Sequence, residues 1–430
     1  MGRALLFLVG GMFIIFGLVQ TGVQGRLTII PERTYNHHAE LHAENAVNSA
    51  MDYAMREIIL DQNWNAGFSS DNLMGASVNV TVFNQNSSDI PPNEIPSWDE
   101  YTLLVHGVAS HDGKLARSQI YLRKDSFSKY SYFTDSELSP GGQNVFFIWS
   151  DVLSGPVHTN GQYNIAGDPT FHGFVTSPQM WSGWSGMTND PQFLGGADFN
   201  SETRDPPSSL ELANLRNAGS SNGLTFNTEV ELEFLAGQQV NVRETDSGAE
   251  YTVSLVPYNG VISSEHQISI KGTIDGQYTV HSTEDIRITG DLVYNDNPFD
   301  NPNSTDLLGI VSEKSVVIDQ NAHLDNGSSD LNIHASIMAL DESFGLENFN
   351  SGSPKGDLNL IGGIIQMKRG PMGTFSGGSI QSGFSKQYEY DERLMQMNPP
   401  SFPRESFFSI VHWYTEVFSE SYFAQQTDDE

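Results

Sequence analysis

The densest group of potential metal ligands lies near the N-terminus and comprises His37, His38, Glu40, His42 and Glu44. His38 and His42 are four residues apart, so a helix would place both on one face, where they could share a metal ion. The zinc-protease pattern His-Glu-x-x-His requires glutamate at the position of Ala39, so that catalytic motif is not present. A solvated helix face is therefore the favoured interpretation, and metal binding is the alternative.

A second candidate site is the loop at residues 295–306, NDNPFDNPNSTD, which carries Asp296, Asp300 and Asp306 among amide side chains. Calcium takes about six to eight oxygen ligands, and carboxylate-rich loops can supply them. The spacing differs from an EF-hand, because it has neither the glycine at the sixth place nor the closing glutamate. These three aspartates are the calcium candidates, a loop of Asx-turns is the competing interpretation, and no other cofactor is predicted.

Scattered basic and aromatic side chains provide a catalytic alternative. Enzymes that cleave acidic polysaccharides need a base and charge-neutralising groups on one face. The basic candidates fall on different predicted strands: Arg287, Lys314, Lys368 and Arg369. Trp181 and Trp184 could stack on sugar rings. The chain has no nucleophile elbow, phosphate-binding loop or dinucleotide fingerprint. We therefore assign no catalytic residue and predict a protein that is not an enzyme, with a polysaccharide lyase or hydrolase as the alternative.

Composition restricts the partners. The chain has 430 residues, with 53 acidic against 21 basic side chains and a formal net charge of −32. That charge repels phosphate backbones, so nucleic acid is not a predicted partner. There is no cysteine, which excludes disulfides, thiolate nucleophiles and cysteine-based zinc sites.

Short strands must position most of these residues. Between residues 266 and 369, runs with period-two alternation are closed by Gly, Asn or Asp, and Ile286, Ile288 and Leu292 point to one face. No long helical pattern interrupts the run, which argues against alternating βαβ units. The pattern predicts a mainly β chain with a right-handed parallel β-helix-like domain, and a β-sandwich is the alternative.

The N-terminal part has a different character. Residues 1–25 are largely apolar and predict a membrane anchor or a signal segment cut after Gly25, with the anchor favoured. Residues 26–66 predict an amphipathic helix, because small residues from Ala39 to Ile58 recur every three or four positions. Residues 67–129 predict a small antiparallel sheet, with a hairpin turn at Asp112-Gly113.

The remaining boundaries follow from composition. Residues 130–400 form the predicted β-helix-like domain, with an irregular excursion at residues 178–223, where periodicity is lost. Residues 401–430 are a proline-punctuated aromatic segment, predicted to cover the end of that domain, followed by a mobile tail.

Several strings resemble a bacterial envelope family known only by a domain of unknown function: SGPVHTNGQYNIAGDPTFHGFVTS (154–177), GTIDGQYTVHSTEDIRITGDLVYND (272–296) and FP-x-x-SFFSIVHWYTE (402–416). The resemblance extends to PilX-type or other type IV minor pilin-like features at the N-terminus, and implies a surface or pilus-associated role. The chain departs from type IV pilins in one respect. A cut after Gly2 would put Phe7 at the fifth mature position, where those pilins have glutamate, so prepilin processing is not implied.

These observations predict a non-enzymatic cell-envelope or pilus-associated structural or adhesion protein. Its body would lie outside the cytoplasmic membrane, either anchored in the inner membrane or extracellular. The predicted partners are other envelope or pilus components at the N-terminal helix, together with a surface polysaccharide. A secreted carbohydrate-binding or polysaccharide-cleaving β-helix protein is the alternative function.

Overall fold

The computed structural model describes residues 2–87, 99–376 and 379–419, but not the side chains of residues 2–10, 24–31 and 419. The chain divides into two compact units, one formed by Met1–Lys124 with Phe407–Glu430 and the other by Asp125–Ser406. The predicted class is confirmed: the chain is mainly β, with an N-terminal helix, a small antiparallel sheet and larger sheets that are mainly parallel.

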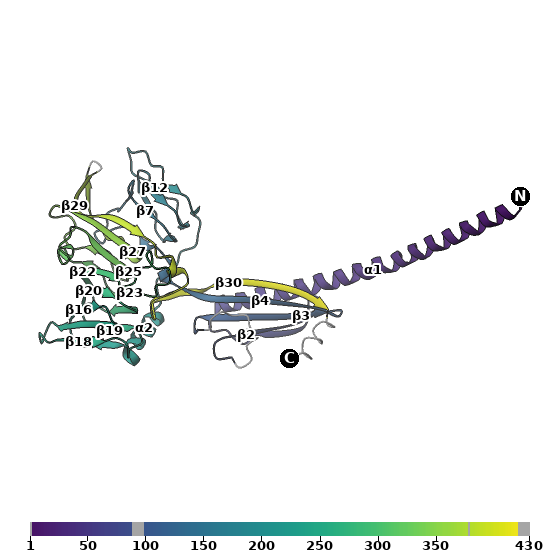
Figure 1. Ribbon diagram of the computed structural model, residues 1–430, viewed down its shortest axis with the longest axis horizontal. Helices are drawn as coiled ribbons and strands as arrows, with labels where there is room; N and C mark the ends of the chain where they lie inside the picture. The colour runs from purple at the N-terminus through teal and green to yellow at the C-terminus, as the bar shows by residue number, and fades with distance from the viewer. Residues whose placement is uncertain (1, 88–98, 377–378, 420–430) are drawn as a thin grey trace. The chain divides into compact units, whose positions relative to one another are not determined.

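The first unit combines one long helix with a five-stranded sheet (Figure 1). The helix α1 spans Gly2–Leu60 without interruption, so the sequence boundary between residues 25 and 26 is not a break in the helix. The sheet order is β1 (Phe68–Leu73), β2 (Ala76–Phe83), β3 (Thr102–His111), β4 (Lys114–Ser126) and β30 (Arg404–Ser419). β3 and β4 meet at Asp112-Gly113, whose positive φ angles of 46° and 74° suit the predicted hairpin turn.

Small side chains explain how α1 lies on this sheet. Ala43, Ala46, Ala50 and Ala54 are fully buried in one apolar cluster with the inward residues of β2, β3 and β4. Gly107 on β3 has no side chain to hold the helix away: a Cβ there would lie 2.6 Å from Sδ of Met51. Each larger apolar side chain buried in such a core contributes about 1.5–3 kcal/mol to the stability of the fold. The close approach of α1 to β3 allows these side chains to be buried completely.

Among the residues that the structure describes, no helix is both long and apolar enough to cross a membrane. Part of the predicted segment 1–25 lies outside the described side chains.

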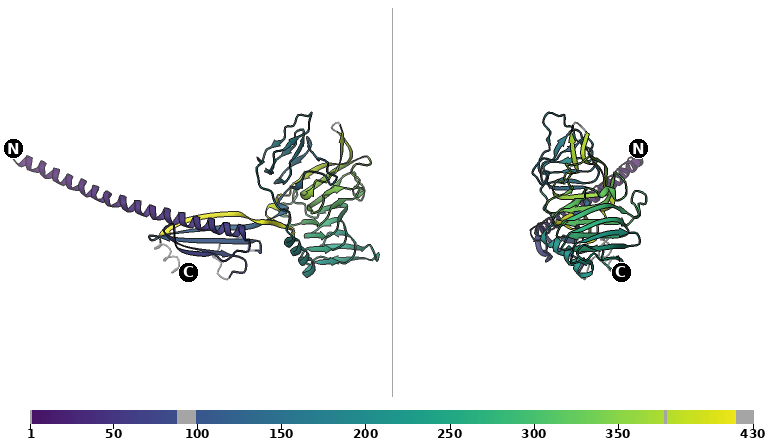
Figure 2. Two further views of the ribbon diagram at one scale, coloured as in Figure 1. Left: turned by 180° about the vertical axis from the view of Figure 1, so that it is seen from behind. Right: turned by 90° about the vertical axis from the view of Figure 1, so that its left-hand side faces the viewer.

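The second unit is built from strands stacked in parallel (Figure 2). One column runs through β15 (Leu224–Phe226), β19 (Val261–Ser264), β21 (Gln277–Ser282), β23 (Leu307–Ser312), β25 (Leu331–Ala339) and β27 (Pro354–Lys368). A second column runs through β16 (Val230–Leu235), β20 (Ile268–Ile274), β22 (Ile286–Tyr294), β24 (Val316–Ile318) and β26 (Phe344–Leu346). Every pairing within these columns is parallel, as expected for stacked coils and not for an antiparallel sandwich.

Register explains the hydrophobic alternation. Ile270, Ile288, Ile318 and Leu346 are successive partners in the second column, and all four are buried. Along β22, buried and half-buried residues alternate strictly, and Ile286, Ile288 and Leu292 share the inner face as predicted. Stacked aliphatic side chains therefore form the continuous core of this unit.

The stack continues beyond β27 into shorter rungs. β27 pairs with β5 (Tyr132–Ser136), which pairs with β8 (Val157–Thr159), followed by β11 (Val175–Thr176) and β14 (Ala197–Asp198). Two further parallel sheets of very short strands accompany them: β6 (Phe147–Ile148), β9 (Asn164–Ala166) and β12 (Ser182–Gly183), and β7 (Val152–Leu153), β10 (Thr170–Phe171) and β13 (Gln192–Phe193). The first part of the expected excursion at 178–223, up to Asp198, is therefore another rung. Only then does the irregular segment lead into helix α2 (Ser209–Asn222).

The C-terminal segment was predicted to cover the end of the β-helix-like domain, but most of its described residues lie elsewhere. Phe402 is buried in the second unit, against a cluster that includes Val311 and Met338. The residues that follow leave this unit and form most of β30, beside β4 in the first unit's sheet. An aromatic, β-prone segment satisfies its backbone equally well on either sheet, so composition could not specify its partner. The predicted mobile tail lies outside the described residues.

Candidate binding pocket

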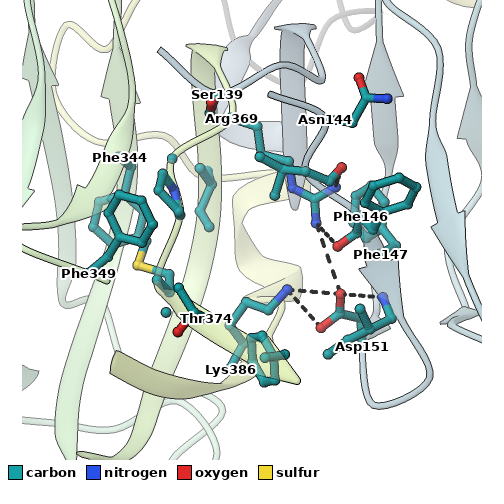
Figure 3. Close-up of a pocket in the computed structure, with 18 of the residues that line it drawn as sticks. Ser139, Asn144, Phe146, Phe147, Asp151, Phe344, Phe349, Arg369, Thr374 and Lys386 are labelled. Atoms are coloured by element: carbon teal, nitrogen blue, oxygen red, sulfur yellow. Dashed lines mark hydrogen bonds and ion pairs between the residues drawn. The ribbon is translucent and has the colours of Figure 1, made fainter. Parts of the chain in front are cut away.

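A cavity of about 590 Å³ lies inside the second unit, beside β27 and between the segment 139–153 and strands β28 (Gly373–Ser376) and β29 (Ser379–Glu389). Aromatic side chains dominate its walls: Tyr132, Phe146, Phe147, Trp184, Phe344, Phe349, Phe375 and Tyr388. Figure 3 shows Phe344 and Phe349 on one side of the pocket, opposite Phe146 and Phe147. Stacked strands supply one wall, and the shorter rungs supply the other.

Arg369 anchors the polar side of the pocket. Its guanidinium is almost fully buried and donates from Nη1 to Oε2 of Glu137 at 2.9 Å and to the carbonyl of Val145 at 3.2 Å. Nη2 donates to the carbonyl of Phe146 at 3.2 Å. The guanidinium carbon also lies 3.7 Å from the centroid of the Phe147 ring, a close cation–π contact. Arg369 therefore fixes the backbone that presents the aromatic wall.

Lys386 and Asp151 form the second charged pair. Nζ of Lys386 lies 2.8 Å from Oδ1 and 2.9 Å from Oδ2 of Asp151, and Oδ2 also accepts the backbone N–H of Ile148 at 3.0 Å. Burial lowers the pKa of the Lys386 ammonium, while the Asp151 carboxylate opposes that change. Figure 3 shows both cationic side chains directed at Asp151, and Nη2 of Arg369 lies 4.0 Å from it.

The aromatic side chains that line the pocket differ in how far they are exposed to solvent. Phe147 is buried and lies 5.3 Å from Tyr132 and 5.4 Å from Phe171, measured between ring centroids. At the mouth, Trp184 is 52% exposed and lies 4.6 Å from Phe146, and Phe375 is 38% exposed. A rigid inner cluster thus supports outer rings that retain a free face.

Two of the side chains singled out from the sequence, Arg369 and Trp184, line this pocket. Trp181 instead packs, partly buried, against the main core. The other basic candidates do not converge. Arg287 binds Asp319 and Glu347, Lys314 pairs with Glu284, and Lys368 is half-buried in β27.

The calcium candidates hold their own loop together. Asp306 is buried and accepts the backbone N–H groups of Gly276 and Asp296, each at 2.8 Å. Asp296 accepts from the amide of Asn301 at 2.7 Å, and Asp300 is exposed. The loop also has two Asx-turns: Oδ1 of Asn297 accepts the N–H of Phe299 at 3.0 Å, and Oδ1 of Asn301 accepts that of Asn303 at 3.1 Å. Calcium binding stays a prediction.

Two histidines of the α1 cluster stack on each other, and one of them also contacts a histidine of β3. The ring centroids of His38 and His42 are 5.8 Å apart, and His42 lies 5.0 Å from His111 of β3. Glu40 binds Lys114 at 2.6 Å. Over the described residues, no group of three or more acidic, histidine or cysteine side chains has the arrangement of a metal site.

A serine–histidine–glutamate arrangement was not visible in the sequence. Oγ of Ser263 lies 2.8 Å from Nδ1 of His281, whose Nε2 lies 2.9 Å from Oε1 of Glu313. These are the residue types of a hydrolytic triad, but α2 covers the serine: a Cβ on Gly219 would lie 2.7 Å from its Cβ. Arg216 of the same helix donates to Glu313. The arrangement therefore fastens α2 to the stack and leaves no approach for a substrate.

A family model described as a domain of unknown function, DUF4900, matches residues 106–179. No curated protein matches the chain. Among solved structures, the chain is similar to the competence-associated pilin ComZ from Thermus thermophilus, with 10% identity and a TM-score of 0.32, over 88% of this chain and 98% of that one.

Proposed function

We propose that this protein is a non-enzymatic structural component of the bacterial cell envelope, built like a minor pilin. Helix α1 would hold it to the membrane or to neighbouring subunits, and the second unit would be presented outside the cytoplasmic membrane. The observation that carries the proposal is the contrast between the two halves of α1. One face of its C-terminal half is buried against the sheet, whereas its described N-terminal residues from Met12 to Val19 are apolar and exposed.

The exposed apolar residues of α1 form a continuous run. Met12, Phe13, Ile14, Ile15, Phe16, Leu18 and Val19 are each more than half exposed. Burying one such side chain contributes about 1.5–3 kcal/mol, so a run of this length strongly favours a partner. A lipid bilayer or equivalent helices of other subunits would both satisfy it.

Strand β30 adds a second exposed apolar surface to the same unit. It is the edge strand of the sheet, and Phe407, Ile410, Val411 and Trp413 are each at least 41% exposed. Natural proteins usually protect long apolar edge strands, because an unprotected edge pairs with other chains. This edge supports a protein that works in contact with other subunits.

The chain offers a direct experiment because it has no native cysteine. Ile15→Cys places one thiol on the exposed part of α1, and Ala249→Cys places a matched thiol on an exposed turn of the second unit. If α1 packs on neighbouring subunits, treating native cells with a bismaleimide should give cross-linked species above monomer mass with Ile15→Cys and only monomer with Ala249→Cys; if lipid alone surrounds α1, both variants should stay monomeric.

Fractionation and N-terminal sequencing of the native protein complete the test. The expected result is an intact or Gly2-processed N-terminus in membrane or sheared-filament fractions. A mature N-terminus at Arg26, with the protein in the soluble secreted fraction, would overturn the proposal, because α1 would then have lost its apolar half.

A further inference from the structure

We propose that the aromatic pocket beside β27 is a binding site for an uncharged saccharide. This inference goes beyond the envelope role, because it assigns a ligand to the second unit and does not depend on how α1 is held. It rests on three features of the pocket: its charge balance, its exposed aromatic faces and the amide groups at its rim.

The charges inside the pocket are already paired. Arg369 is bound to Glu137, and Lys386 is bound to Asp151. Each of the two cations that line the pocket already has a bound carboxylate, so a charged ligand would lose its hydration without finding a free counter-charge. The net charge of −32 adds a long-range repulsion against anionic glycans. Charge therefore selects a neutral ligand.

The aromatic rings select a ligand with an apolar face. Trp184 and Phe146 form a contacting pair, and Phe375 contributes a further ring with a free face. A pyranose ring exposes a face of C–H bonds that lies flat on such rings, while its hydroxyls point outward to polar groups. The cavity volume of about 590 Å³ is within the range of about 300–1,000 Å³ that is typical of small-molecule sites.

The rim supplies groups that suit hydroxyls. Gln143, Asn144 and Asn350 line the pocket and are exposed. An amide side chain both donates and accepts hydrogen bonds, so it can satisfy a hydroxyl in either role. Aromatic faces beside uncharged amides thus match a neutral sugar better than an aliphatic ligand, which would leave the amides unused.

The experiment uses the full chain and a defined panel of probes. Maltotriose, cellotriose, xylotriose and chitotriose represent neutral saccharides, and oligogalacturonate represents an acidic one. Isothermal titration calorimetry should detect binding of at least one neutral probe and no binding of oligogalacturonate. Binding of the acidic probe alone, or of none of the five, would overturn the proposal, while the cross-linking result for α1 would be unaffected.

A matched pair of substitutions locates the site. Trp184→Ala should weaken binding of the responding saccharide at least about tenfold, because it removes the exposed stacking face. Trp149→Ala is the control. Trp149 lies in the segment 139–153 and is 40% exposed, but it is not among the residues lining the cavity. Both residues are well exposed, so both variants should keep the parent melting temperature. Equal loss in the two variants, or unchanged binding in Trp184→Ala, would reject this pocket as the site.

Discussion

Nζ of Lys386 lies 2.8 Å from Oδ1 of Asp151, although 235 residues separate them in the chain. The lysine belongs to β29, and the aspartate immediately precedes β7. The pair therefore ties the end of the long stack to the shorter rungs, at the polar side of the pocket. Because both groups are largely removed from water, each depends on the other for compensation of its charge.

Asp151→Asn should destabilise the second unit by about 3 kcal/mol, because it leaves the Lys386 ammonium buried without its counter-charge. Urea denaturation followed by circular dichroism measures the change. Glu284→Gln is the control: its pair with Lys314 is solvent-exposed, so water screens it and the expected cost is much smaller. Similar costs for both substitutions would show that the buried pair has no special role.

Stability should fall as the pH drops from about 6.5 towards 4, because buried histidines resist protonation. Burial lowers the pKa of His158 to about 4, with its bond to Asn160 acting in the opposite direction, and burial lowers that of His334 to about 4. The unfolded chain takes up these protons near pH 6.5 and the folded chain does not, so the stabilisation is present above pH 6.5 and is lost on acidification.

Each of these histidines should contribute a slope of up to about 1.4 kcal/mol per pH unit in that window. Denaturation series between pH 4 and 7.5 measure it. His158→Gln and His334→Gln should each flatten the profile, even where they lower stability at neutral pH. A slope identical to the parent protein in both variants would refute the assignment.

The fold class could be predicted from local sequence patterns, because such a pattern depends only on which face of a single helix or strand is buried. The alternation of Ile286, Ile288 and Leu292 requires only that a strand be buried on one side, and the small-residue stripe of α1 requires only a close neighbour. Both were confirmed. The two-residue strands between Ser182 and Asp198 are too short to show any period, so this rung read as irregular.

The pocket could not be assembled from the sequence. Arg369 and Trp184 were both named, but their proximity depends on how the segment 139–153 folds beside β27. The burial of Glu137 and Asp151 cannot be predicted from the sequence, because an isolated acidic residue in a turn is expected to be a solvated charge. β30 shows the same limit. Its aromatic pattern predicts a strand but not which sheet receives it.

The contact between α1 and β3 should be intolerant of added volume. Gly107→Val would force its Cβ against Met51 and to within 3.1 Å of Cγ2 of Val47, so a loss of about 1–3 kcal/mol is expected from overpacking. The midpoint of thermal unfolding of the full chain, followed with a spectroscopic probe in the first unit, measures this loss of stability. Gly22→Ala is the control, since nothing lies within 4 Å of the added carbon. Equal effects in the two variants would contradict the close-packing account.

The loop 295–306 should depend on Asp306 more than on calcium. Asp306→Asn replaces one of the two carboxylate oxygens that accept the N–H groups of Gly276 and Asp296. An amide nitrogen cannot accept either bond, so a cost of about 1–3 kcal/mol is expected. Asp300→Asn is the control, because Asp300 is exposed, and it should change stability by less than about 0.5 kcal/mol.

Thermal unfolding of the parent chain with millimolar calcium, and separately with a chelator, tests the ion itself. Because Asp306 and Asp296 are already engaged within the loop, we expect the two midpoints to coincide. A ligand that binds only the folded state raises the midpoint with its concentration. A calcium-dependent rise in the parent chain that disappears in both Asp300→Asn and Asp306→Asn would establish the calcium site and displace the Asx-turn interpretation.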